Sequence, residues 1–545
     1  MRYFAHVSKT RSVIAVIFLG LLLTACSGGG ASSEVAVDPL TVSTASGDVV
    51  GFVEGPADAF LGIPYASPPV GTARWQPPGP PPAWGSPRDA YSFSSICPQP
   101  SDALGQGVPG EPVVLVGNED CLYLNVWRPS SRSGSSLPVL VFIHGGGNFA
   151  GSASDPLGVV INTDSSTPLY DGAKLSALSD IVVVTLNYRL GPLGYLNTPV
   201  LASASPTGTA GNYGILDQIA ALKWVRDNIA AFGGDPNRVL VAGQSGGARD
   251  TCVLLVSPQA SGLFGRVAMH SGPCSVQTTD DAQARAQLLL DELGCSTATD
   301  PLACLYGQTA DKLVLAVSSR PRGFGDPAFL PSIDGYIVSA QPDNLIATGM
   351  HNAVPVIIGS NSDEYDNRFD TIPEAQYADD LALLVPGQYA AEALLIYPLS
   401  DYPSATEAYV AALSDRNIVC PTRRRARALV ANQAAPVYRY EFRQGLAAPE
   451  AQATGAYHVL DLLYLFQHMD NQDFAATADD QAVADLMGRR WGAFAAQADP
   501  NDGSLPTWEE YDQTNEKYLA IQPMAAIETH LRDTQCNFWD SIIQP

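Results

Sequence analysis

A serine flanked by small residues is the feature of this sequence with the clearest chemical potential. The segment Gly243-Gln244-Ser245-Gly246-Gly247 fits the pattern GxSxG. Residues 239–242 (VLVA) before it predict a strand, and residues 248–255 after it predict a helix. A serine on such a tight strand-to-helix turn is exposed, and the helix N-terminus favours negative charge developing beside it. The pattern therefore predicts that Ser245 is a nucleophile, whereas an idle serine in a glycine-rich turn is the alternative.

A second glycine cluster, His144-Gly145-Gly146-Gly147, directly follows a predicted strand at 137–143. Acyl transfer passes through an oxyanion, which needs backbone N–H donors that no side chain blocks. We assign Gly146 and Gly147 to this oxyanion hole, with the N–H of Gly246 as a further donor. The alternative is a simple loop.

The nucleophile needs a base, and the base needs an orienting carboxylate. His458 follows the small-residue turn Gly455-Ala456-Tyr457, and Glu364 follows a predicted strand at 355–358, where a triad acid belongs. The order Ser245, Glu364, His458 is the order that this arrangement uses. The residues alone leave rivals open. They are His6, His144, His270, His351, His468 and His530 for the base, and Asp363 and Asp366 for the acid.

The elements that must position these residues alternate along the chain. Strands are predicted at 137–143, 181–187, 239–242 and 355–358, and the apolar spacing of 216–232 is that of an amphipathic helix. Strands alternating with helices indicate an α/β fold, with a mostly parallel central sheet covered by helices on both faces. Such sheets place their sites at the carboxyl ends of the strands.

The N-terminus carries an export signal. Arg2, Lys9 and Arg11 precede an apolar run at 13–23, which is short for a membrane span. The run ends in Leu23-Thr24-Ala25-Cys26, which resembles a bacterial lipobox. We expect a signal peptide at 1–26 with lipidation of Cys26, a flexible tether at 27–38 and a single large domain at 39–545. Ser27 favours anchoring to the outer membrane, and a secreted or periplasmic protein is the alternative.

Composition limits the partners and the compartment. The chain carries 55 acidic against 30 basic residues, a net charge of −25, which disfavours nucleic acid. Without Cys26 eight cysteines remain, and their spacing fits disulfides in an exported protein better than a metal site. We predict no metal, no cofactor and no protein partner.

The chain resembles the type-B carboxylesterases. Residues 232–247, from Phe232-Gly233-Gly234 to the GxSxG motif, fit the serine signature of that family. Residues 119–126 (EDCLYLNV) fit its second signature. The likeness also covers 60–75 (FLGIPYASPPVGTARW) and 187–196 (NYRLGPLGYL), and it spans nearly the whole mature chain.

This resemblance implies the α/β-hydrolase fold and ester hydrolysis by a serine, without metal or cofactor. It also places Glu364 in the GxNxxE position of the family and His458 in its GAxH position. It further implies three disulfides, which are Cys97–Cys121, Cys295–Cys304 and Cys420–Cys536. Cys252 and Cys274 match no pair of the family, so a fourth bridge and two buried thiols are both open.

The sequence departs from the family at several points. Gln244 replaces a Glu, Tyr365 replaces a Gly, and Asn148 replaces the aromatic residue after the three glycines. No Trp lies between residues 97 and 121, where cholinesterases hold a quaternary ammonium, so choline esters are disfavoured. Arg249 and Asp250 are unusual in the helix behind the serine.

We therefore expect a serine carboxylesterase that works through an acyl-enzyme. A non-catalytic cholinesterase-like binding protein is the rival from another class. An amidase, thioesterase or lipase with the same triad is the rival among enzymes.

Overall fold

The computed structural model describes residues 40–105, 111–131, 136–161, 165–320, 328–365, 371–446, 455–470, 474–504 and 506–542. The predicted signal peptide, Cys26 and the tether lie outside these ranges, so the domain boundaries at 26 and 38 stay predictions. Within the ranges given, no helix is both long and apolar enough to cross a membrane.

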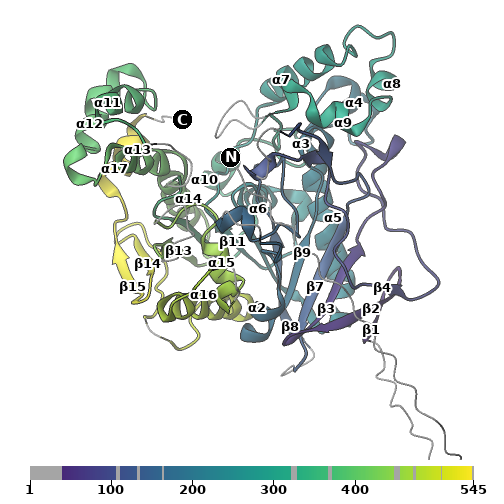
Figure 1. Cartoon of the computed structure of the whole chain (residues 1–545), viewed down its shortest axis with the longest axis horizontal. Helices are drawn as coiled ribbons and strands as arrows, with labels where there is room; N and C mark the ends of the chain where they lie inside the picture. The colour runs from purple at the N-terminus through teal and green to yellow at the C-terminus, as the bar shows by residue number, and fades with distance from the viewer. Residues whose placement is uncertain are drawn as a thin grey trace, which may run out of the picture. The chain divides into compact units, whose positions relative to one another are not determined.

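A 13-stranded sheet runs through the structure (Figure 1) in the order β1-β2-β3-β7-β9-β8-β10-β11-β12-β13-β14-β15, with β4 paired to β2. The central strands of this order, from β9 to β14, are all parallel to one another. The strands at the two ends of the order pair antiparallel with their neighbours, and these are β1, β2, β3, β7 and β15. The strands are β1 (Leu40–Thr44), β2 (Gly47–Glu54), β3 (Ala57–Pro64), β4 (Arg88–Asp89), β7 (Tyr123–Pro129), β8 (Leu137–Ile143), β9 (Val182–Leu186), β10 (Gly234–Gln244), β11 (Arg266–His270), β12 (Val356–Asn361), β13 (Val437–Phe442), β14 (Lys517–Ile521) and β15 (Ala526–Thr529). A separate pair joins β5 (Gln99–Pro100) to β6 (Leu115–Val116).

Alternate side chains of each central strand enter two separate hydrophobic cores. On β8, Val139 and Val141 belong to one core, and Leu140 and Phe142 belong to the other. Every residue of β8 and β9 is buried. A strand buried on both faces favours apolar residues on both, which explains the nearly continuous apolar runs in the sequence.

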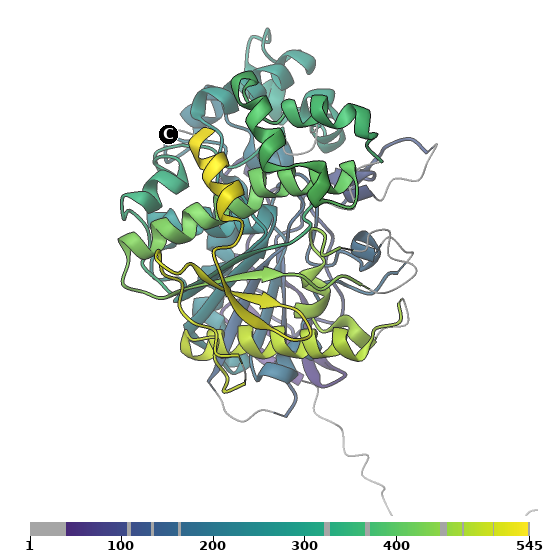
Figure 2. The same cartoon turned by 90° about the vertical axis from the view of Figure 1, so that its left-hand side faces the viewer.

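Helices cover both faces of the sheet. α5 and α6 pack against β10 on one face, while α16 contacts β8 and β10 and α2 contacts β3 and β7 on the other. Figures 1 and 2 show α16 lying along the sheet, and α17 beside α12 and α14. The helices of eight or more residues are α5 (Tyr213–Asn228), α6 (Gly246–Val256), α7 (Thr279–Glu292), α11 (Glu374–Ala382), α13 (Ala405–Ser414), α14 (Cys420–Asn432), α16 (Ala478–Gln497) and α17 (Asp533–Ile542). Shorter ones are α1 (Gly158–Ile161), α2 (Ala173–Ser179), α3 (Gly191–Tyr195), α4 (Pro199–Ala204), α8 (Pro301–Tyr306), α9 (Ala310–Leu315), α10 (Pro342–Ala347), α12 (Ala390–Ile396) and α15 (Asp461–Leu465). The predicted α/β class with a mostly parallel sheet is confirmed.

Two predicted elements differ in extent from the observed ones. The helix predicted at 216–232 begins at Tyr213 and ends at Asn228, and residues 229–232 form a 3-10 turn. The strand predicted at 239–242 is part of the longer β10, whose start pairs Gly234 with Leu137. The first half of β10 contains Asp235, Asn237 and Arg238, so hydropathy could not reveal it.

The parallel strands share one carboxyl edge. The loops after β8, β10 and β12, together with the segment that follows β13, all leave from this edge. These connections contain Gly146, Ser245, Glu364 and His458, so residues far apart in sequence converge on one edge.

Candidate active site

Ser245 occupies a sharp turn between β10 and α6. Its backbone has φ +56° and ψ −118°, which is strained for a residue with a side chain. Its N–H donates to the carbonyl of His270 on β11 at 3.0 Å. A Cβ at Gly243 would lie 2.3 Å from the carbonyl oxygen of Gly247, and one at Gly247 would lie 2.1 Å from that of Ile143. A side chain at either position would therefore clash with the backbone, so both residues must be glycine. Ser245 itself is partly exposed, while the residues on either side of it are buried.

His458 and Glu364 are joined by a short hydrogen bond. Nδ1 of the imidazole lies 2.6 Å from Oε2 of the carboxylate, which is fully buried. The other oxygen, Oε1, accepts the N–H of Asn361 at 2.8 Å. The His458 N–H donates to the carbonyl of Glu364 at 3.1 Å, so the backbone also ties the two loops together. This carboxylate fixes the proton on Nδ1 and leaves Nε2 as an acceptor.

The side chain of Gln244 faces that acceptor. Its Nε2 lies 3.1 Å from Nε2 of His458, whereas no hydrogen bond joins Ser245 Oγ to His458, although the structure describes both residues. The amide therefore occupies the lone pair that the serine would use. The sequence marked Gln244 as a departure from the family, but its contact with the base required the structure.

The rival acids and bases have other partners. Asp363 accepts the N–H of Ala456 at 3.1 Å and so braces the loop that carries His458, while Asp366 lies outside the described residues. His270 forms a second histidine–carboxylate pair, with Asp461 at 2.9 Å, and its Nε2 accepts the indole N–H of Trp491 at 2.9 Å. This second pair is fully buried, so it lacks access to a substrate.

The other histidines are also engaged away from the serine. His144 stacks on Tyr188, His351 contacts Gln433, His468 contacts the carbonyl of Leu169, and His530 pairs with Asp533. His6 lies outside the described residues.

The glycine loop after β8 packs directly on the nucleophile turn. Gly146 has φ +98°, a conformation open to glycine but strained for other residues. A Cβ at Gly246 would lie 2.8 Å from the nitrogen of Gly147, and one at Gly145 would lie 3.2 Å from Cβ of Ser245. Among the described residues, no acceptor takes the N–H of Gly146 or Gly147, and the N–H of Gly246 is in the first turn of α6. Free donors thus converge beside Ser245.

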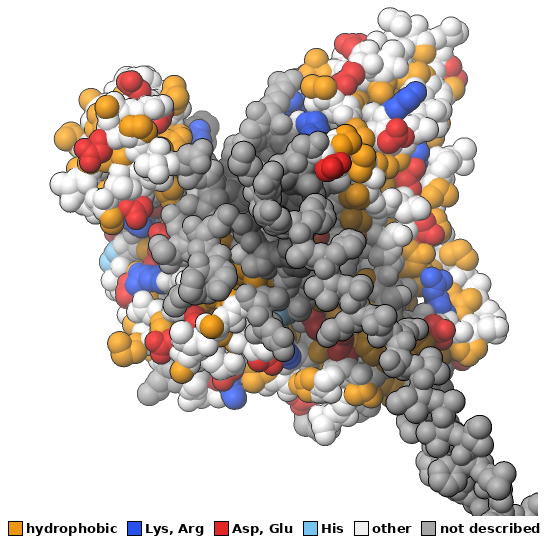
Figure 3. Space-filling model, viewed as in Figure 1, with side chains coloured by type: hydrophobic (Ala, Val, Ile, Leu, Met, Phe, Trp, Pro, Cys, Tyr) orange, Lys and Arg blue, Asp and Glu red, His pale blue; other side chains and the backbone are white. Residues whose placement is uncertain are grey.

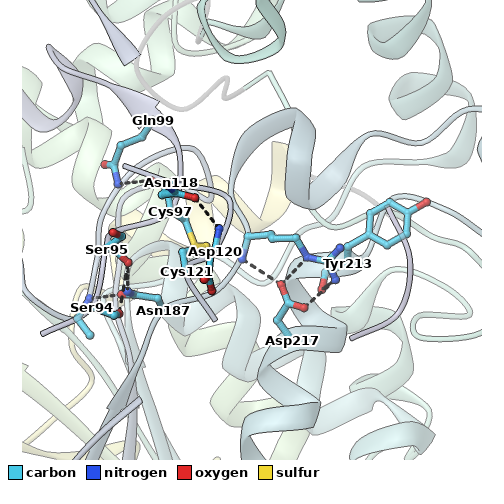
Figure 4. The surroundings of a disulfide bond; sticks show 12 residues. Ser94, Ser95, Cys97, Gln99, Asn118, Asp120, Cys121, Asn187, Tyr213 and Asp217 are labelled. Atoms are coloured by element: carbon cyan, nitrogen blue, oxygen red, sulfur yellow. Dashed lines mark hydrogen bonds and ion pairs between the residues drawn. A yellow bond between two sulfur atoms is a disulfide. The ribbon is translucent and has the colours of Figure 1, made fainter. Parts of the chain in front are cut away.

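A disulfide loop supports the far end of this glycine loop. Gln99 donates to the carbonyls of Cys97 and Gly151 at 3.1 and 3.0 Å, and it accepts the N–H of Gly151 at 2.8 Å. Cys97 is bonded to Cys121, and Figure 4 shows Gln99 near this bridge. The second signature of the sequence therefore contributes to the scaffold of the site.

The remaining cysteines are paired as well. Cys295–Cys304 and Cys420–Cys536, which the family resemblance implies, are present, and Cys252 on α6 is bonded to Cys274. The alternative of two free thiols at 252 and 274 is therefore not what the structure contains.

Three departures from the family form one buried network behind the glycine loop. Nδ2 of Asn148 lies 2.8 Å from both carboxylate oxygens of Asp250, and Oδ1 of Asn148 accepts a hydrogen bond from Arg249 at 3.1 Å. Gln218 and Tyr195 also donate to Asp250, at 2.5 and 3.4 Å. The network ties α6 to Asn148, the residue that follows the three glycines of the loop after β8.

Burial shifts the protonation equilibria around the site. It raises the pKa of Asp250 to about 6, although hydrogen bonds from Gln218 and Asn148 act in the opposite direction. It lowers the pKa of His144 to about 4, so this imidazole is neutral at pH 7. A neutral His144, with Nδ1 2.8 Å from the carbonyl of Gly145, supports the loop without adding charge.

The described residues contain no metal-binding cluster, and the one face shown in Figure 3 has no basic patch among its described side chains. No cluster of histidine, cysteine or carboxylate side chains within the described ranges could hold a metal ion. On the face in Figure 3, acidic side chains are spread widely, and the basic ones are fewer and dispersed.

Comparisons with known proteins agree with this arrangement. The model of the carboxylesterase family matches residues 38–539. The chain is 34% identical to para-nitrobenzyl esterase of Bacillus subtilis (strain 168), over 89% of this chain and 96% of the relative. It is 33% identical to fumonisin B1 esterase of Sphingopyxis macrogoltabida, over 94% and 92%. A solved structure of PNB esterase, 31% identical, superimposes with a TM-score of 0.76 over 92% of this chain and 99% of the other, which confirms the α/β-hydrolase fold.

Proposed function

The chain belongs to the carboxylesterase family and is a carboxylic ester hydrolase, and we propose that it works through an acyl-enzyme formed on Ser245. Glu364 orients His458, and His458 serves as the base. The observation that carries this proposal is the 2.6 Å contact between Glu364 Oε2 and His458 Nδ1. That contact leaves Nε2 as the proton acceptor on the side of the nucleophile turn.

The steps follow from these positions. Nε2 of His458 takes the Ser245 proton as Oγ attacks the ester carbonyl, and the N–H groups of Gly146, Gly147 and Gly246 bind the oxyanion. The C–O bond to the alcohol then breaks, and His458 gives its proton to the leaving oxygen. Water, deprotonated by the same imidazole, attacks the acyl-enzyme and releases the acid. Glu364 stabilises the imidazolium without taking its proton.

The test is hydrolysis of 4-nitrophenyl esters of increasing acyl length by the mature protein and by Ser245→Ala. Hydrolysis of short esters that the variant lacks supports the proposal, as does labelling of Ser245 by a fluorophosphonate. A wild type that shows neither hydrolysis nor labelling would contradict the proposal and favour the binding-protein alternative. A preference for long acyl chains, amides or thioesters would instead favour the lipase, amidase or thioesterase.

We further propose that the mature protein is a lipoprotein anchored through Cys26 to the outer membrane. The lipobox-like sequence before Cys26 and the flexible residues after it support this. Expression of the full chain in a Gram-negative host tests it. We expect an alkyne-tagged fatty acid to label the wild type in the outer membrane fraction but not Cys26→Ser. An unlabelled wild type in the periplasm or the medium would overturn it.

A further inference from the structure

Arg249 is a buried cation one helical turn from the nucleophile. It follows Ser245 by four residues on α6, and its N–H donates to the Ser245 carbonyl at 3.0 Å. Residues four apart lie on the same helix face, and helical side chains lean toward the N-terminus, which here means toward the serine. Only 7% of Arg249 is exposed.

The guanidinium has neutral partners only. Its Nε donates to the carbonyl of Ser275, and its Nη1 donates to Oδ1 of Asn148, both at 3.1 Å. No carboxylate of the described residues lies within 4.0 Å of it. The adjacent Asp250 instead receives the amides of Asn148 and Gln218. Burial lowers the pKa of Arg249, although the charge of Asp250, which forms no ion pair with the guanidinium, acts in the opposite direction.

One edge of the guanidinium stays open. Its Nη2 forms no hydrogen bond with a described residue. This atom is not fully buried, so it is accessible to solvent. A cation that is held by two neutral oxygens and exposes one donor edge is suited to receive an anion.

The position of Arg249 indicates which part of a substrate would meet it. His458 must protonate the leaving oxygen, so the alcohol part of the ester lies on the side of His458. The acyl part then extends away from His458, and Asn148, which follows Gly147 in the glycine loop, accepts a hydrogen bond from Arg249. One helical turn, about 6 Å along the axis, separates the backbones of Ser245 and Arg249, so a short diacid joined to Ser245 is of the length needed to approach the guanidinium.

We propose that Arg249 binds a free carboxylate on the acyl part of the substrate. Half-esters of short dicarboxylic acids, such as succinic and glutaric acid, are then the preferred substrate class. This inference rests on the proposed function, since it assumes that Ser245 is acylated. The net charge of −25 repels anionic substrates in general, so a preference for them requires a local cation.

The test compares two esters that differ only in the free carboxylate. They are the 4-nitrophenyl monoester of glutaric acid and its methyl diester, 4-nitrophenyl methyl glutarate. In the wild type we expect kcat/KM to be at least about tenfold higher for the monoester, because a charge-assisted hydrogen bond is lost on methylation. In Arg249→Met we expect this preference to disappear. The ratio of the two esters cancels any general loss from the contact with Asn148.

Arg266→Met is the matched control. Arg266 is also a buried arginine without an ion pair among the described residues, but it lies at the start of β11, far from the carboxyl edge. We expect this variant to keep the wild-type ratio. If Arg249→Met does not fold, the wild-type ratio still decides, because a diester cleaved as well as the monoester overturns the inference. An equal ratio in wild type and Arg249→Met also overturns it, while the esterase function stands. If the wild type cleaves neither ester, the proposed function fails and this inference fails with it.

Discussion

The amide of Gln244 lies 3.1 Å from Nε2 of His458, the atom that accepts the proton of Ser245 in the proposed mechanism. Glu364 fixes the proton of the imidazole on Nδ1, so the amide can donate to the lone pair on Nε2. Gln244 thus holds His458 in the tautomer that the proposed mechanism needs, and in that mechanism it also competes with Ser245 for the same lone pair. A carboxylate at this position, as in the family pattern, would instead favour the charged imidazolium.

Gln244→Glu should move the acidic limb of the kcat/KM profile to higher pH by about one pH unit, because a nearby carboxylate stabilises the imidazolium. The profile on 4-nitrophenyl butyrate from pH 5 to 9 measures the shift. Gln244→Met, which is neutral, serves as the control and should leave the limb in place. An unshifted limb in the Glu variant would contradict the role given to this contact.

Glu364→Gln should lower kcat by about 10³- to 10⁴-fold while the fold is retained. The carboxylate accepts from both His458 and the N–H of Asn361, and one amide oxygen can satisfy only one of them. An amide donor facing Nδ1 forces the proton onto Nε2, and the imidazole can then no longer accept the serine proton. Steady-state kinetics and the unfolding temperature measure the two effects. Activity within tenfold of the wild type would point to Asp363 or another acid.

The stability of the protein should depend on pH through His144. Its pKa is about 4 in the folded state, because of burial, and about 6.5 in the unfolded state. Between these values the unfolded state binds a proton that the folded state lacks, so stability is lost as the pH falls from 6.5 toward 4.

The matching variant is His144→Phe, which keeps a ring against Tyr188 but cannot titrate. Between pH 7.5 and 5 the wild type should lose about 2 kcal/mol more of its free energy of unfolding than the variant. Unfolding midpoints at both pH values give the comparison. Equal losses would show that His144 is not held neutral.

Asp250→Asn should destabilise the protein by about 1–3 kcal/mol at pH 7, although the new side chain has the same shape. Both oxygens of Asp250 receive amide donors, so the new NH2 group must face another donor. Asp227→Asn is the control, because Asp227 pairs with Arg226 at an exposed site. Thermal unfolding measures both variants, and an unchanged midpoint for Asp250→Asn would mean that the network does not hold α6 to the glycine loop.

All eight cysteines after Cys26 should be oxidised in the purified protein. Alkylation of the unfolded, non-reduced protein followed by peptide mass mapping should find no labelled cysteine, and the peptides of Cys252 and Cys274 should be joined. Cys252→Ser with Cys274→Ser should lose about 3 kcal/mol, since the bridge closes a loop of 22 residues. Labelling at these two positions would restore the alternative of buried thiols.

The sequence alone predicted those parts of the site that are formed by residues within a few positions of one another. Ser245 and the glycines of 144–147 are recognisable because a tight turn and a donor-rich loop each need particular residues within a few positions. The apolar runs at 137–143 and 181–187 indicated a parallel sheet for the same reason, since strands buried on both faces are mostly apolar.

The tertiary structure decided which histidine and which carboxylate lie together near the turn of Ser245. From the residues alone several histidines could serve, and the fold contains two histidine–carboxylate pairs, His458–Glu364 and His270–Asp461. Only the order of the strands brings the first pair to the nucleophile turn, while burial closes the second. The contacts of Gln244 with His458 and of Arg249 with Asn148 likewise join distant segments. Such contacts depend on which strands are neighbours, and no local sequence pattern carries that information.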